Sequence, residues 1–500
     1  MRSSNYTLPP LILDSSGIGD SVPRSRSTSR APIRPLPTLR PGADTAETYE
    51  IIPYVAAPQS TSINAFCSTP CMKWVFTGGS DGYIRKYDWF SSINGKVPLT
   101  VAQKHPFVDS VTRAGVLLSY WENEEQPVKN NLLHIPETTD DTKLSPVYSL
   151  AVHSQALWLL SGLESGGINL QTVRHDEGRI VHTLRQHSSA VSVLTLSSDE
   201  ISVLSGSWDR TIADWDLNTG QPVRIYTLPA GQISSLEFRP TSTALPVATT
   251  NGTTSAPGTG AAASPAESNR SFGSLFGDDD DDGNPRSPQQ SNSTISDSTL
   301  QAVPSSNGDQ PPPPPTKDSQ QSHQSDSIFL STSMDGLLRI YDRRTSSQAP
   351  IFTAHPPRGC PPWCMSAVWS TDGNSIYCGR RNSTVDEFSL YNGLATPMRT
   401  LKFPLGSGPV SALCAMPNGR SLICASFDNL RLWDLKADMQ EESGKKRGKL
   451  AVPFEIVPGH HGGVVSKVWV DRSCRYLLSV SGNRGWEGVT TEVWLGYTIT

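Results

Sequence analysis

The stretch from Val75 to Phe90 reads VFTGGSDGYIRKYDWF. An apolar run leads into two glycines, an Asp-Gly pair follows, and alternating apolar and polar residues close on Tyr-Asp. A phosphate-binding loop would need a helix after the glycines, with its first N–H groups facing the phosphate. YIRKYDW instead alternates with a period of two, which is typical of a strand. GGSDG is therefore predicted to be a tight turn between two strands, in which Gly82 tolerates a positive φ.

The same strand–turn–strand unit recurs along the chain when the turn aspartate serves as a marker. That residue is Asp209 in VLSGSWDRTIADWD, Asp335 in FLSTSMDGLLRIYD and Asp428 in LICASFDNLRLWD. Residues 241–325, rich in Ser, Gly, Pro and Asp, interrupt one interval, and without these 85 residues Asp209 and Asp335 are 41 apart. Two further units fill the 93 residues from Asp335 to Asp428. A period of about 40 to 45 residues with four short strands is typical of a WD40 propeller blade.

The sequence therefore predicts an all-β fold, a WD40 β-propeller of seven blades, with eight blades as the alternative. The clear units are residues 63–104, 147–187, 190–231, 232–355, 365–404, 409–460 and 464–500. Segment 106–136 is either an excursion after the first blade or a degenerate eighth unit. The strand that begins EIIPYV at Glu50 is expected to pair beside the final unit, because closing the circle removes exposed sheet edges.

Length and composition set bounds on the class of protein. Five hundred residues exceed one ordinary core, which agrees with a repeat architecture. A net charge of -5 and a pI near 6.1 give no overall basic field, so direct sequence-specific DNA binding is not expected. The start has no signal-peptide pattern and no window approaches the apolar length of a membrane span. We expect an intracellular protein whose partners are proteins, with no membrane contact.

Two parts of the chain have the composition of disordered segments. Residues 1–48 form an Arg-, Ser- and Pro-rich arm, and residues 241–325 form a long acidic insert within the propeller, which is assigned to residues 49–500. The acidic run of the insert comprises Asp278, Asp279, Asp280, Asp281 and Asp282. Such a run could attract a basic partner or could be a solvated linker. A basic patch that could serve as a nuclear import signal comprises Lys445, Lys446, Arg447 and Lys449.

Four polar residues of one unit suggest either catalysis or architecture: His187, Ser205, Asp209 and Trp215. The first three are the residue types of a serine hydrolase triad. A nucleophilic serine, however, needs an exposed and strained turn, and the chain contains no G-x-S-x-G motif. Each residue falls instead where WD40 blades place a buried polar network that links their strands. We predict a structural network, no catalytic residue and no enzyme activity.

Two cysteine pairs have a spacing that could suggest zinc. They are Cys67 with Cys71 and Cys360 with Cys364, the latter in CPPWC. The two pairs belong to different units, and free cysteines commonly act as small buried hydrophobic residues. Neither a metal nor another cofactor is expected.

Three stretches go beyond the general WD40 pattern: FTGGSDGYIRKYDWFSSINGK (76–96), AGVLLSYWENEE (114–125) and ALWLLSGLESGGINLQTVRHDEG (156–178). Together they resemble the WD-repeat subunit of the fungal SAGA transcription co-activator complex, the Spt-class subunit that engages the TATA-binding protein. The similarity covers about residues 49–500, apart from the insert. It implies a non-enzymatic nuclear scaffold that docks on a histone-acetylating complex and regulates RNA polymerase II transcription through the TATA-binding protein.

The side chains just before the turn aspartates are the candidate partner-binding residues: Ser80, Trp208, Met334 and Phe427. These positions tend to be exposed on one face of a propeller, where aromatic and Met side chains are suited to anchor a protein. We expect this face to contact the TATA-binding protein. The alternative function is another binding module, a WD40 substrate receptor of a ubiquitin ligase or a histone-tail reader, which would use the same face.

Overall fold

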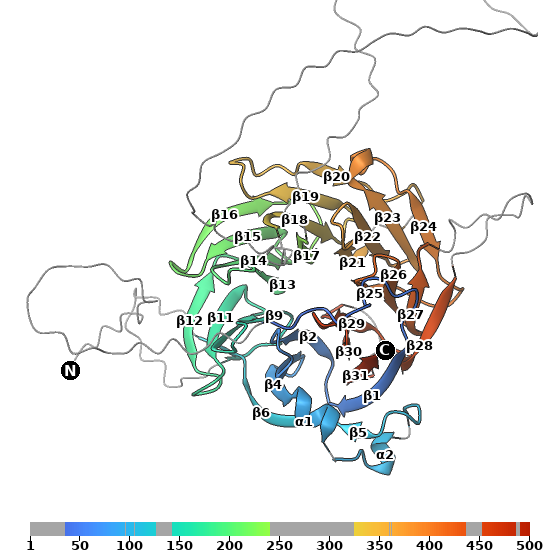
Figure 1. Ribbon diagram of the computed structural model, residues 1–500. Helices are drawn as coiled ribbons and strands as arrows, with labels where there is room; N and C mark the ends of the chain where they lie inside the picture. The colour runs from blue at the N-terminus through green and yellow to red at the C-terminus, as the bar shows by residue number, and fades with distance from the viewer. Residues whose placement is uncertain are drawn as a thin grey trace, which may run out of the picture. The chain divides into compact units, whose positions relative to one another are not determined.

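A computed structural model describes residues 36–95, 97–104, 106–126, 143–240, 325–359, 361, 363–436, 453–486 and 491–500. These residues form a ring of seven sheets, which we number as blades 1 to 7 in the order of their inner strands along the chain. Figure 1 shows the blades side by side around a common centre. The predicted all-β propeller with seven blades is confirmed.

Blades 1 to 6 have four strands each, named in order from the inner strand to the outer one. Blade 1 has β2 (Ile63–Ser68), β3 (Trp74–Gly79), β4 (Tyr83–Asp88) and β6 (Val116–Glu122); blade 2 has β9 (Leu150–Val152), β10 (Trp158–Gly162), β11 (Gly167–Thr172) and β12 (Ile180–Arg185). Blade 3 has β13 (Val191–Leu196), β14 (Ser202–Ser207), β15 (Thr211–Asp216) and β16 (Gln221–Thr227); blade 4 has β17 (Ile233–Arg239), β18 (Ser325–Ser333), β19 (Leu338–Asp342) and β20 (Phe352–Ala354).

Blade 5 has β21 (Cys364–Trp369), β22 (Ser375–Arg380), β23 (Thr384–Ser389) and β24 (Arg399–Lys402); blade 6 has β25 (Val410–Ala415), β26 (Ser421–Ser426), β27 (Asn429–Asp434) and β28 (Phe454–His461). Blade 7 has β29 (Val465–Val470), β30 (Tyr476–Ser481), β31 (Val493–Ile499), β1 (Ile51–Pro58) and β5 (Arg113–Ala114). A separate pair is β7 (Glu124–Glu125) with β8 (Lys143–Leu144), and the helices are α1 (Trp89–Asn94), α2 (Val101–Lys104) and the 3-10 turn η1 (Leu390–Asn392). No helix in the described part is long and apolar enough to cross a bilayer.

The glycine-rich stretch of blade 1 forms the predicted turn. β3 and β4 pair antiparallel on either side of it, and Gly82 has a φ of 79°. Gly78 has a packing role instead, because a Cβ atom there would lie 2.3 Å from the side chain of Val147 in the segment leading into blade 2. The glycines therefore serve the turn and the contact between two blades.

The ring is closed by the two ends of the folded chain. β1 pairs antiparallel with β31, from Ile51 opposite Ile499 to Pro58 opposite Val493, and a short parallel pairing with β5 covers its other side. The side chain of Val55 is completely buried in this sheet. The predicted pairing of the leading strand with the final unit is confirmed.

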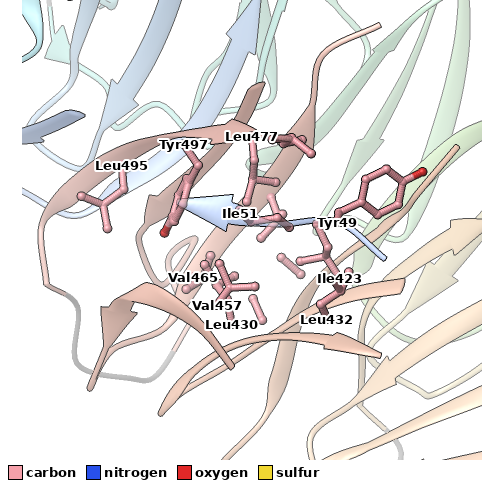
Figure 2. Close-up of a cluster of buried hydrophobic side chains, with 14 of the residues drawn as sticks. Tyr49, Ile51, Ile423, Leu430, Leu432, Val457, Val465, Leu477, Leu495 and Tyr497 are labelled. Carbon is pink, nitrogen blue, oxygen red and sulfur yellow. The ribbon is translucent and has the colours of Figure 1, made fainter. Parts of the chain in front are cut away.

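Apolar side chains between blades 6 and 7 form the largest buried cluster of the described part. Figure 2 shows Ile51 of β1 and Tyr497 of β31 beside residues such as Leu430 of β27 and Val465 of β29. Tyr49 packs at the edge of the same cluster and is almost completely buried, which raises its pKa to about 12. The segment before β1 thus contributes to the interface between two blades.

Neighbouring blades are also joined near the central axis by a repeated hydrogen bond. A serine at the start of one inner strand donates to a backbone carbonyl of the next inner strand: Ser149 to Val191 (2.7 Å), Ser192 to Ile233 (2.8 Å), Ser411 to Val465 (2.7 Å) and Ser466 to Ile63 (2.6 Å). Close approach is possible because the adjacent strand carries a small residue. A Cβ atom on Gly162, for example, would lie 2.6 Å from the Val191 carbonyl oxygen.

Blade 1 differs from its predicted boundaries. Its outer strand is β6, so the unit does not end at residue 104. The described part of segment 106–136, residues 106–126, supplies this strand of blade 1 and forms no eighth blade. The reason is that Asp88 at the end of β4 also caps α1, accepting a hydrogen bond from the Ser91 N–H at 2.8 Å. The chain then passes through α1, α2 and β5 before it returns to the sheet.

Residues 36–48 also differ from expectation, because they were assigned to the disordered arm. The Arg40 side chain donates to the Ile499 carbonyl at 2.9 Å, and Ala43 is almost completely buried against blades 6 and 7. Asn418 donates to the Ala46 carbonyl at 3.0 Å. Residues 1–35 and almost all of the 241–325 insert lie outside the described residues, and β18 begins at Ser325.

Replacing Val55 with aspartate should destabilise the ring. The new carboxylate would be buried in the closing sheet without a cation, so we expect the free energy of unfolding to fall by about 3 kcal/mol or more. Chemical denaturation followed by fluorescence measures the change. The matched control is Val101→Asp on α2, where the side chain is 90% exposed and a change within about 0.5 kcal/mol is expected. Equal stability of the two variants would contradict the role of β1 in closure.

Candidate functional site

The four polar residues predicted to form a network lie together in blade 3. His187 Nε2 lies 2.7 Å and Trp215 Nε1 lies 2.8 Å from Ser205 Oγ, and His187 Nδ1 lies 3.2 Å from Asp209 Oδ2. The His187 side chain is fully buried and only 9% of the Asp209 side chain is exposed. Ser205 lies buried in the middle of β14, whereas a nucleophilic serine is presented on an exposed turn. The geometry suits a structural link between strands.

The environment of Asp209 keeps its carboxylate charged. Burial by itself would raise its pKa, but hydrogen bonds from His187 and Thr211 and from the backbone N–H of Ser188 outweigh burial and hold the pKa well below its usual range. The carboxylate thus ties the segment before blade 3 to the turn between β14 and β15.

Three other turn aspartates are held by arginine instead of histidine. In each case the arginine follows the aspartate by three or four positions on the third strand of the blade. The pairs are Asp81 with Arg85, Asp335 with Arg339 (3.1 Å) and Asp428 with Arg431 (2.6 Å). Sequence reasoning missed these arginines, although a turn aspartate followed by arginine at that spacing would have indicated them. In blade 3 this position is Ala213, and His187 takes the role of the arginine.

The inner strands line a central cavity of about 360 Å³. Serines and aliphatic side chains make up much of its wall, and its charged groups are Glu237, Lys467 and Arg484. Burial raises the pKa of Glu237 to about 7, although the backbone N–H of Trp369 donates to its carboxylate at 3.0 Å. Among the described residues there is no group of three or more His, Cys, Asp or Glu side chains placed to hold a metal ion.

Two of the four candidate partner-binding residues line a common pocket at the end of the ring that carries the turn aspartates. Trp208 of blade 3 and Met334 of blade 4 share this cavity of about 480 Å³ with Trp363, which precedes β21, and Trp486, which follows β30. Arg210, Gln232 and Asp335 supply polar groups to its wall. We call this cavity the indole pocket. Three indole rings and a thioether from four blades meet there.

The other two candidates lie apart from the indole pocket. Ser80 of blade 1 is exposed, and its Oγ accepts a hydrogen bond from Asn64 at 2.7 Å. Phe427 of blade 6 is half-buried beside the turn at Gly408. Trp208 and Met334 are also half-buried, so the expected exposure is found in full only for Ser80.

Sequence reasoning also missed Trp363 and Trp486. The prediction of the exposed face used the residue before each turn aspartate. The described residues that follow the second strand of blade 7 read GNRGW and contain no aspartate. Trp363 lies at the same end of the ring, but it directly precedes the inner strand β21. A search for residues before turn aspartates does not find it. Tryptophans beside the first strand or the second turn of a unit would have been the better signal.

The segment after β30 that carries Trp486 also reaches the central cavity, because Arg484 is part of the cavity wall. Arg484 donates to the carbonyl of Ser234 on the inner strand of blade 4, and its guanidinium lies 4.5 Å from the Trp486 ring centre. A Cβ atom on Gly485 would lie 2.7 Å from Tyr148 and 2.8 Å from Trp208. This segment therefore forms part of both the central cavity and the indole pocket.

Several predicted features lie outside the described residues. They are the acidic run 278–282, the basic patch from Lys445 to Lys449, and Cys360. The other three cysteines of the two pairs are free: Cys67 and Cys71 are half-buried in blade 1, and Cys364 is buried in β21.

The ring and its indole pocket define a class of protein, a WD40 β-propeller whose turns build an aromatic recess on one face. Within that class, the chain belongs to the SPT8 beta propeller family, whose model matches residues 49–500. It is 45% identical over 465 residues to the SAGA complex subunit Spt8 of Schizosaccharomyces pombe, covering 93% of this chain and 82% of that protein. It is 38% identical over 464 residues to the SAGA complex subunit SPT8 of Saccharomyces cerevisiae, and this match covers 91% of this chain and 73% of that protein. The resemblance found in the sequence is confirmed.

Removing the central hydroxyl of the blade 3 network should destabilise the fold. Ser205→Ala leaves His187 Nε2 and Trp215 Nε1 without their shared partner in a buried site, so we expect a loss of about 1 to 3 kcal/mol in the free energy of unfolding. Ser91→Ala, at an exposed position of α1, is the control and should change stability by less than about 0.5 kcal/mol. An unchanged unfolding midpoint for Ser205→Ala would contradict the structural role.

The low pKa of Asp209 predicts a dependence of stability on pH. Because folding lowers this pKa, its stabilisation is complete above the pKa of the unfolded chain, about 4, and is lost as pH falls below that value. Asp209→Asn should therefore be less stable than the unchanged chain at pH 7, and the difference should shrink below about pH 4. Thermal melts across this pH range measure it. A constant difference would show that the charge of Asp209 is not involved.

Proposed function

We propose that this chain is a non-enzymatic scaffold subunit of a SAGA-type histone-acetyltransferase co-activator complex in the nucleus. In this role it engages the TATA-binding protein and so regulates transcription by RNA polymerase II. Family membership supports the first part, since both relatives are named as SAGA complex subunits. The second part follows from the resemblance to the Spt-class subunit that engages the TATA-binding protein.

The indole pocket is the observation that carries the partner-binding part of the proposal. Tryptophan and methionine side chains that meet in one recess offer a large apolar area, and such residues dominate the free energy of protein interfaces. Arg210 at the wall adds a charged group that can orient a partner, whereas the charge of Asp335 is already paired with Arg339. The pocket is built from turns of a rigid ring, so little ordering is required when a partner binds.

Truncating the pocket should weaken the contact with the TATA-binding protein. The double change Met334→Ala with Trp363→Ala removes two half-buried side chains from two blades while leaving the strands intact. We expect the affinity for purified TATA-binding protein to fall at least tenfold, about 1.4 kcal/mol, because anchor side chains carry most of such an interface. Titration of the purified chains by calorimetry measures the change.

The control for this experiment is Tyr391→Ala. Tyr391 is 57% exposed on η1, which lies at the opposite end of the blade 5 strands from Trp363, so affinity should not change. Equal affinity of the double variant and the unchanged chain, with both folded, would contradict the proposed site.

Purification of the tagged chain from its native cells tests whether it assembles into the proposed complex. Acetyltransferase-complex subunits support the proposal, whereas ubiquitin-ligase subunits would support the alternative.

A further inference from the structure

The outer strand of blade 1 exposes an unusual amount of apolar surface. On β6, Leu117 is 44% exposed, Leu118 is 49% exposed and Tyr120 is 64% exposed. β6 is the last strand of its sheet, and no described strand pairs with its outer edge. The strand lies within AGVLLSYWENEE, one of the three stretches that go beyond the general WD40 pattern.

The outer strands of blades 2 to 6 do not share this property. Each exposes at most one large apolar side chain: Val181 on β12, Val223 on β16, Ile456 on β28, and none on β20 or β24. Edge strands of soluble proteins usually carry charged or short sequences, since an apolar edge invites another strand to pair. Three exposed apolar side chains on one edge therefore indicate a surface that is covered in an assembly.

Three acidic side chains lie at the end of β6 and directly after it. Glu122 is exposed and Glu124 and Glu125 are half-buried, and none of the three forms an ion pair with a described residue. A cavity of about 540 Å³ opens beside them, lined by Tyr83, Tyr120, Glu122, Glu124, Glu177 and Arg179 among others. Glu177 is already paired with Lys86, so the carboxylates of Glu122 and Glu124 remain to attract a cation.

We propose that the edge of β6 is a docking site for an extended, positively charged segment of another subunit of the same assembly. The segment would add a strand beside β6, so that backbone hydrogen bonds hold it, Leu118 and Tyr120 receive its apolar side chains, and the carboxylates after β6 receive its Lys or Arg residues. This inference rests on the proposed function, because it takes the partner from the complex.

A second copy of this chain, paired through its own β6, fits the acidic end of this edge less well than a basic segment does. β6 reads VLLSYWE and contains no basic residue, so a second β6 would bring no cation to the carboxylates after the strand. The site also differs from the indole pocket in its position. β6 is the outermost strand of blade 1, whereas the pocket is built by turns and connections of blades 3, 4, 5 and 7.

The test compares complexes purified through a tagged copy of the full chain. Leu118→Lys with Tyr120→Lys removes the apolar contact and repels a basic segment, and recovery of the acetyltransferase-complex subunits should fall at least tenfold. The control, Val223→Lys with Ile456→Lys, places the same charges on the outer strands of blades 3 and 6 at similar exposure and should leave recovery unchanged. Undiminished recovery with the β6 variant would overturn the proposal.

A second pair of variants tests the sign of the charge. Leu118→Glu with Tyr120→Glu removes the same apolar contact but attracts a basic segment, so it should retain more of the complex than the lysine variant. A greater loss with glutamate would overturn the assignment of a basic segment. Affinity for the TATA-binding protein should remain unchanged in all of these variants, because the indole pocket is intact.

Photo-crosslinking identifies the occupant directly. A benzoylphenylalanine at position 118 should crosslink to a segment of another subunit that carries Lys or Arg next to apolar residues. A crosslink to a second copy of this chain, or to an acidic segment, would contradict the proposal. If the unchanged tagged chain recovers no acetyltransferase-complex subunit at all, the proposed function itself fails, and this outcome is distinct from a loss confined to the β6 variants.

Discussion

The pairing of β1 with β31 is the constraint on which the rest of the ring depends. Each blade buries its two faces only against its neighbours, so an open ring would leave the faces of two blades in water. The eight residues of β1 join the start of the described chain to its end, and Val55 and Ile51 place apolar side chains in the joint. Closure thereby fixes the angle between all seven blades.

That fixed angle is what brings distant residues to one place. The serine hydrogen bonds near the axis set the spacing of inner strands, and the turn aspartates hold the turns at one end of the blades. Trp208 and Trp486 are far apart in sequence, yet they line one pocket because the blades that carry them cannot move independently. β6 belongs to the same rigid ring, but it is the outermost strand of blade 1 and lies away from the indole pocket. The two proposed docking sites therefore do not overlap.

The sequence predicted the repeat well and the site only in part. Period and alternation depend on local chemistry, so the blades, the Asp81 turn and the closing strand could be inferred from the residues. Which side chains share a pocket depends on the ring, so Phe427 was grouped with Trp208 although they lie apart. Burial of Ala43 could not be inferred from the Ser- and Pro-rich composition around it, since its partners come from blades 6 and 7.

The pairing partner of β1 also has a consequence for synthesis. A strand at residues 51 to 58 leaves the ribosome long before residues 493 to 499 are synthesised. Its apolar side chains therefore lack their pairing partner during the synthesis of the residues between the two strands. Contacts of such sequence separation form slowly, because a very long loop must close before they contribute. Closure of the ring therefore has to wait until β31 has been synthesised, and a chaperone that shields the nascent strand β1 would raise the yield of complete rings.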